Sequence, residues 1–196
     1  MITNENIEGA TPLDPDEMAG LKLKHITTRG ELDELEQANI VQGMLWIKKH
    51  NRQNILSIDF ICKLHKALFG GVWAWAGSFR KTEKNIGIDP LHITVNLRNL
   101  VDDACAWIEF KSFPSYEAIL RLHHQLVKIH PFPNGNGRFS RIYADLVAEV
   151  YFGLDPIEWG GTSLDSMTET RKNYIQALRK ADLGDYRLLM DLYCKD

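Results

Sequence analysis

The segment 130–141 carries the residue types that could do chemistry on a phosphate group. It reads His-Pro-Phe-Pro-Asn-Gly-Asn-Gly-Arg-Phe-Ser-Arg. Gly135 and Gly137 free the backbone to adopt positive φ and to approach a ligand closely, and successive N–H groups in such a turn can bind an anion. Because the apolar pattern predicts a helix directly after the loop, the positive end of that helix would face the same anion. These features together predict a phosphate cradle.

Three side chains add to this cradle. Arg138 presents a planar fork of donors that suits phosphate, and Arg141 follows three residues later on the same helix face. His130 stands at the edge of the loop, and a neutral imidazole is the usual general base near neutral pH. A base beside a phosphate cradle indicates transfer of a phosphorus group to a hydroxyl, which a plain connector between helices would not need. We expect Phe132 to point into the core and to anchor the loop.

The elements that must position this loop are helices. Apolar residues recur at spacings of three and four along most of the chain, as in a helix with one buried face. Ser57 and Ser115 are expected to be the N-caps of two of these helices, whereas the proline-containing residues 1–20 are expected to form a loop. The predicted helices cover about 31–49, 58–69, 96–108, 116–129, 138–152 and 163–181, with a last one opening after 184–185.

The pattern changes between residues 85 and 95. Ile86-Gly-Ile88 and Ile93-Thr-Val95 read as two short extended pieces, and Asp89-Pro90 reads as the turn between them. We therefore expect one short β-hairpin in a fold that is otherwise mostly α.

Composition narrows the class of partner. The 196 residues carry a net charge of −3, and a domain that grips nucleic acid through its phosphates is usually basic. We expect no direct nucleic-acid partner. No apolar run approaches the length of a membrane span, and the N-terminus does not resemble a signal peptide. Together with the scattered cysteines, this favours a cytoplasmic protein without a membrane partner.

The loop resembles the signature of the Fic family, His-x-Phe-x-(Asp/Glu)-Gly-Asn-Gly-Arg-x-x-Arg. Residues 64–69 and 72–80 resemble the family's segment before its flap, so the resemblance implies a Fic-type helical bundle over 31–196 after an extension over 1–30. Residues 11–16 and 25–32 resemble a subgroup called mobile mystery protein B, which implies a helix-turn-helix companion protein. The signature matches at His130, Phe132, Gly135, Asn136, Gly137, Arg138 and Arg141.

The resemblance implies protein adenylylation. His130 would take the proton from a Ser, Thr or Tyr hydroxyl of a target protein, and that hydroxyl would attack the α-phosphate of ATP. Gly135, Asn136 and Gly137 would form the anion hole, and the two arginines would hold the β- and γ-phosphates. The hairpin would be the family's flap, and its residues would pin the target as an added strand. The flap residues are Asn85, Ile86, Gly87 and Ile88.

One position departs from the signature. Asn134 stands where the family has the acidic ligand of Mg²⁺, and because magnesium prefers charged oxygens we expect Mg²⁺ or Mn²⁺ to be held weakly. A catalytically weak or inactive Fic-fold module that binds nucleotide is therefore one alternative. A Doc-like protein kinase is the other, although such kinases have Lys where this chain has Gly137.

The resemblance to the family also implies a means of inhibiting the activity. Many Fic proteins are held inactive by a Glu in a Ser/Thr-x-x-x-Glu-Gly/Asn helix, in the manner of a toxin and its antitoxin when the helix belongs to a small companion protein. Three places come near this pattern, Thr27-x-x-x-Glu31, Asn4-x-x-x-Glu8 and Glu36-x-x-Asn39. We expect all three glutamates to lie on solvated faces. Inhibition by a small companion protein is the other option. A homodimer is a further option.

Overall fold

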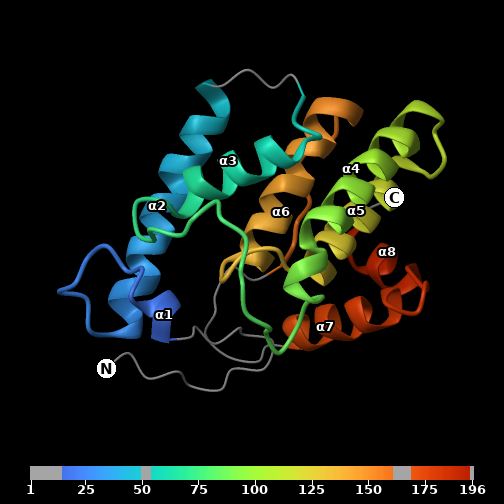
Figure 1. Cartoon of the computed structure of the whole chain (residues 1–196). Helices are drawn as coiled ribbons and strands as arrows, with labels where there is room; N and C mark the ends of the chain where they lie inside the picture. The colour runs from blue at the N-terminus through green and yellow to red at the C-terminus, as the bar shows by residue number, and fades with distance from the viewer. Residues whose placement is uncertain (1–14, 50–53, 161–168, 195–196) are drawn as a thin grey trace.

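Helices form most of the described chain (Figure 1). The computed structural model describes residues 15–49, 54–160 and 169–194. No β-strand is found among these residues, and their one isolated β-bridge joins Leu21 to Trp73. None of the described helices combines the length and the hydropathy that a membrane span requires. The elements are α1 (Pro15–Met18), α2 (Arg29–Lys49), α3 (Ile58–Phe69), η1 (Pro90–His92), α4 (Ile93–Glu109), α5 (Ser115–Ile129), α6 (Asn136–Val147), η2 (Ala148–Phe152), α7 (Glu169–Ala181) and α8 (Arg187–Tyr193).

The core is built around the helices that flank the segment 130–141. α5 packs against α4 on one side and α6 on the other, and α3 packs against α2, α4 and α6. Phe132 is fully buried at the centre of this core, as predicted from the sequence. The His65 ring from α3 stacks on it at 3.7 Å, and Phe139 from α6 meets it edge-on at 5.2 Å. The loop between α5 and α6 is thus anchored by aromatic packing.

Local sequence signals explain several helix boundaries. The Ser57 hydroxyl accepts the Phe60 N–H at 3.2 Å and caps α3, which confirms both the predicted cap and the predicted range. α2 begins with a capping box, in which the Thr28 hydroxyl accepts the Glu31 N–H and the Glu31 carboxylate accepts the Thr28 N–H. α6 continues through the π-helical turn η2 and stops at Gly153, whose φ of 64° is left-handed.

The predicted β-hairpin is wrong. Ile93 is fully buried in the first turn of α4, and the Asp89 side chain accepts the Leu91 N–H at 2.8 Å to start η1 just before it. The helix therefore begins at Ile93, three residues before the predicted start at about 96. Residues 80–89 form an irregular loop, because the Arg80 guanidinium, and no second strand, binds the carbonyls of Thr82 and Ile88.

Two other boundaries also differ from prediction. Ser115 is the first residue of α5 and makes no capping hydrogen bond, since Pro114 takes the cap position. Residues Pro15–Met18 form the short helix α1, where the sequence predicted loop. The predicted start of α7 at about residue 163 lies outside the described residues.

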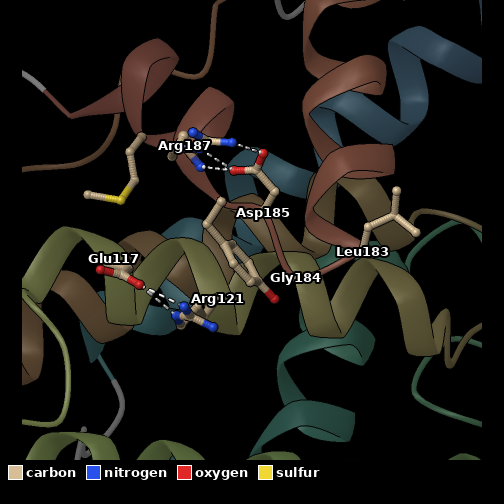
Figure 2. A pocket seen from close by; sticks show the side chains of 8 residues that line it. Glu117, Arg121, Leu183, Gly184, Asp185 and Arg187 are labelled. Atoms are coloured by element: carbon tan, nitrogen blue, oxygen red, sulfur yellow. Dashed lines mark hydrogen bonds and ion pairs between the residues drawn. The ribbon is translucent and has the colours of Figure 1, made fainter.

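α7 and α8 cover α5 through two buried histidines. His123 bonds the Tyr174 hydroxyl at 2.9 Å, and His124 bonds the Tyr186 hydroxyl at 2.9 Å. Figure 2 shows the open hollow where the turn between α7 and α8 meets α5, with Arg121 bound to Glu117 on its floor. This hollow shares no residue with the segment 130–141.

The extension predicted over residues 1–30 is described from Pro15 onward, and this part lies against the remainder of the chain. The Glu17 carboxylate forms an ion pair with Lys84 at 2.5 Å, and the Glu17 carbonyl accepts the Trp75 indole N–H at 2.9 Å. Leu21 is buried in the main core. The division of the chain at residue 30 stays a prediction.

The two serines offer a test of the fold. We expect Ser57→Ala to lower the free energy of unfolding by about 1 kcal/mol, because the Phe60 N–H loses its acceptor. Ser115→Ala is the matched control and should cost clearly less, because the Ser115 hydroxyl caps nothing. Urea unfolding of both variants measures the difference. Equal losses would contradict this account of how α3 begins.

Candidate active site around residues 130–141

His130 ends α5 in a conformation that is uncommon for a residue with a side chain. Its φ is 52° and its ψ is 61°, which is left-handed, and its N–H still bonds the Leu126 carbonyl at 3.1 Å. The residue is buried. The pKa of His130 is lowered to about 4, chiefly by burial and also by the positive charges of Arg80 and Lys84, whereas a hydrogen bond with the Val127 backbone acts to raise it. The imidazole is therefore neutral at physiological pH and able to accept a proton.

Asn136 closes the loop after His130. Its side-chain oxygen accepts the Phe132 N–H at 2.9 Å, and its side-chain N–H donates to the Phe132 carbonyl at 2.7 Å. The Asn136 side chain is buried and is therefore a structural clamp. The expected anion hole can use only the backbone N–H of Asn136.

The start of α6 presents backbone donors. Gly135 occupies the N-cap position with a φ of 78°, and no side chain of the described residues caps the helix there. A Cβ at Gly135 would lie 2.7 Å from the Phe69 ring, whereas a Cβ at Gly137 would meet nothing within 4 Å. Gly135 is thus required by the fold, and Gly137 leaves the helix N-terminus open to a ligand.

Arg80 joins the loop to the segment 82–88. Its guanidinium donates to the His130 carbonyl at 2.6 Å and to the Thr82 carbonyl at 2.9 Å, and its backbone N–H donates to the Pro131 carbonyl at 2.9 Å. Gly87 packs so closely here that a Cβ would lie 2.7 Å from the His130 Cβ. Of the predicted flap residues, Gly87 therefore packs against His130, in an irregular loop and not in a hairpin.

The two arginines of the segment make different contacts. Arg138 donates to the Glu36 carboxylate at 2.7 Å, and Glu36 is only 3% exposed. The other oxygen of Glu36 accepts the Trp73 indole N–H at 2.6 Å. Arg141 lies with its guanidinium carbon 4.8 Å from the centre of the Tyr174 ring on α7.

The contact with Glu36 corrects one expectation. Glu36 was expected on a solvated face, but it is buried because α2 turns it toward Arg138 and Trp73. Glu31 is exposed as expected and caps α2, and Glu8 lies outside the described residues.

Comparison with known proteins places this site in a family. Residues 55–148 match the model of the Fic/DOC family, a range that includes α3 to α6 and the whole of the segment 130–141. Residues 55–148 form a Fic domain. The chain is 30% identical over 148 residues to protein adenylyltransferase fic-1 of Caenorhabditis elegans, an alignment that covers 71% of this chain and 26% of the relative. It thus spans about a quarter of the length of this curated relative.

Solved Fic structures share the fold. The N-terminal FIC domain of Bep8 from Bartonella sp. 1-1C has a TM-score of 0.70 at 16% identity, and the match covers 88% of this chain and 87% of that one. Fic-1 (aa134–508) from C. elegans has a TM-score of 0.62 at 25% identity, with coverage of 95% and 55%. The mostly helical Fic fold predicted from the sequence is confirmed. The match to the mobile mystery protein B subgroup stays a prediction.

Asn134 does not form a metal ligand in this Fic loop. Its side-chain oxygen accepts the Gly135 N–H at 2.6 Å, and its carbonyl accepts from His65 at 3.1 Å. No group of three acidic, His or Cys side chains that could hold a metal occurs among the described residues. The donors at this position therefore do not fit a resident Mg²⁺.

Sequence reasoning missed the residues that support the Fic loop from outside it. Buried His65 bonds the Asn134 carbonyl and accepts the Gly77 N–H at 3.0 Å, and burial lowers the pKa of His65 to about 3. His65 and Arg80 both fall in the segments that resemble the family, which was the available signal. Nothing in the spacing of Glu36 pointed to Arg138, which lies far along the chain.

The two glycines of the Fic loop provide a matched pair for a test. We expect Gly135→Ala to lower the free energy of unfolding by at least about 2 kcal/mol, because Ala is strained at positive φ and its Cβ would clash with Phe69. Gly137→Ala should change stability by no more than about 0.4–1 kcal/mol, in the stabilising direction. Thermal and urea unfolding compare the two variants. A larger loss for Gly137→Ala would show that the loop is not packed as described.

Proposed function

We propose that this chain transfers AMP from ATP to a hydroxyl of a target protein. The observation that carries the proposal is a buried, neutral His130 directly before an uncapped helix N-terminus that is open at Gly137. The curated relatives in nematodes and in Aedes aegypti are named protein adenylyltransferases, which supports the same reaction.

His130 acts as the general base in this proposal. It takes the proton of a Ser, Thr or Tyr hydroxyl, whose oxygen forms a bond to the α-phosphorus of ATP. The bond from that phosphorus to the oxygen bridging to the β-phosphate breaks, and pyrophosphate leaves with the electron pair. A base with a lowered pKa keeps its acceptor lone pair through the physiological pH range.

The start of α6 and the arginines hold the phosphates. The N–H groups of Asn136 and Gly137 and the positive end of the α6 dipole stabilise negative charge on the transferred group, because the Gly135 N–H is already bound to the Asn134 side chain. Arg138 and Arg141 supply positive charge for the β- and γ-phosphates. Because the donors at Asn134 do not fit a resident metal, no step here passes through Mg²⁺.

Glu36 holds the site in a restrained state. Arg138 cannot bind a phosphate with its full fork while it is paired with the buried Glu36 carboxylate. A phosphate would also be repelled by that carboxylate at close range. Nucleotide therefore binds productively only when the pair is broken, either by movement of α2 or by a companion protein, such as the expected helix-turn-helix partner.

The loop 82–88 positions the target segment. Asn85, Ile86 and Gly87 are exposed, and Arg80 fixes both ends of this stretch through the carbonyls of Thr82 and Ile88. An extended target segment would pair with this exposed backbone and present its hydroxyl to His130.

Intact-mass measurement after incubation with ATP and Mg²⁺ tests the proposal. Glu36→Gln keeps an acceptor for Trp73 but removes the charge that competes with phosphate, so we expect AMP addition to itself or to lysate proteins to rise at least tenfold over the native chain. Adding His130→Asn should abolish it, because Asn tolerates left-handed φ but does not act as a base. Glu109→Gln, on the exposed face of α4, is the matched control.

The mass that is added distinguishes the three candidate functions. An added AMP that depends on His130 supports adenylylation, and an added phosphate favours a Doc-like kinase. Bound ATP with no addition in the Glu36→Gln variant favours a module without catalysis and contradicts the proposal.

Asn134 allows a separate test of metal use. We expect Asn134→Asp to raise the transfer rate and to make it depend more steeply on Mg²⁺ concentration, because a carboxylate is a better ligand than an amide oxygen. The measurement is the rate against Mg²⁺ concentration in the Glu36→Gln background. An unchanged rate and an unchanged Mg²⁺ dependence would show that this position does not limit the reaction.

A further inference from the structure

The outer face of α2 is apolar although no described helix covers it. α2 packs chiefly against α3, and its buried residues Leu32, Glu36, Ile40, Gly43 and Ile47 form one face. In Figure 1 the helix runs along one edge of the molecule. On the side away from its buried face, large apolar side chains reach solvent: Val41 is 51% exposed, Leu45 44% and Met44 41%.

These side chains belong to a regular stripe, which we call the α2 stripe. It consists of Glu34, Ala38, Val41, Leu45 and Lys48, all of which are exposed. Steps of four and three residues alternate along it, which is the spacing of the seam where two helices pack in a coiled coil. At 100° per residue the stripe lies opposite the buried face, so it can contact another molecule without disturbing the core.

The charges of the α2 stripe indicate which molecule that is. Glu34 lies seven residues before Val41 and Lys48 lies seven residues after it. If a second copy of α2 crosses antiparallel at Val41, Glu34 of each copy meets the partner's Lys48, and the apolar residues meet in between. A parallel pair would instead place like charges together. A surface that complements itself under a two-fold rotation is the signature of an isologous dimer.

We propose that α2 is a homodimer interface in which two copies of this chain pack antiparallel through the α2 stripe. The helix is about 31 Å long at 1.5 Å per residue, so a contact along it alone forms a small interface. The dimer is therefore expected to be weak and to depend on protein concentration. This inference does not rest on the proposed function, and its test uses no enzymatic readout.

Sedimentation velocity of the full chain over a series of concentrations tests the interface. The native chain should shift from monomer to dimer as the concentration rises. Glu34→Lys and Lys48→Glu should each weaken the dimer at least about tenfold, because each places like charges opposite one another twice in the dimer. The double variant Glu34→Lys/Lys48→Glu should restore dimerisation, since it exchanges the two signs.

Two further variants complete the design. Leu45→Asp should abolish the dimer by placing a charge in its apolar centre, and circular dichroism confirms that each exposed substitution leaves the chain folded. Asp103→Lys makes the same charge change as Glu34→Lys, on the exposed face of α4, and should leave dimerisation unaltered. A native chain that stays monomeric at every concentration overturns the proposal. So does a double variant that fails to recover, because only the antiparallel crossing pairs residue 34 with residue 48.

Discussion

The constraint on which this structure depends is that a loop running through the core must find partners for its backbone. Between α5 and α6 the chain passes through the aromatic centre of the molecule, where unpaired carbonyl and N–H groups are costly. Arg80 binds the carbonyls of His130 and Pro131, Asn136 binds both polar groups of Phe132, and His65 binds the carbonyl of Asn134. The loop is rigid because its partners come from three different parts of the chain.

These contacts determine which polar groups of the loop can bind a ligand. The side chains of Asn134 and Asn136 are already bound to backbone groups of the loop, so they serve its shape. The backbone donors that this arrangement offers to a ligand are the N–H groups of Asn136 and Gly137 at the start of α6, beside the buried imidazole of His130. Arg80 also binds the segment that packs against His130, so His130 and this segment are held by one guanidinium. Burial keeps His130 neutral.

The helix α2 has one face toward the site and the opposite face toward solvent. On its inner face Glu36 is held by Arg138 and Trp73, and removing one partner would leave a buried charge uncompensated. On its outer face the α2 stripe presents an apolar seam with opposite charges at its ends. One helix thus carries both Glu36, which competes with phosphate at Arg138 in the proposed function, and the surface of the proposed dimer.

The sequence by itself determined what depends on neighbours along the chain. The spacing of apolar residues placed the helices, the Ser57 cap fixed the start of α3, and the segment 130–141 identified the loop and its family. Predictions from the sequence were wrong where a contact with a distant residue outweighed the local conformational preference. Ile93 and Val95 have strand-forming side chains, yet they lie in α4, because the Asp89 cap starts a helix there and Arg80 takes the carbonyls that a second strand would need. Only the tertiary structure decided that Glu36 meets Arg138, that Asn136 is a clamp, and that His65 and Arg80 hold the loop. Each of these contacts joins residues that no periodicity relates, and each exists because a buried polar group takes whichever partner the packing of the helices brings within reach.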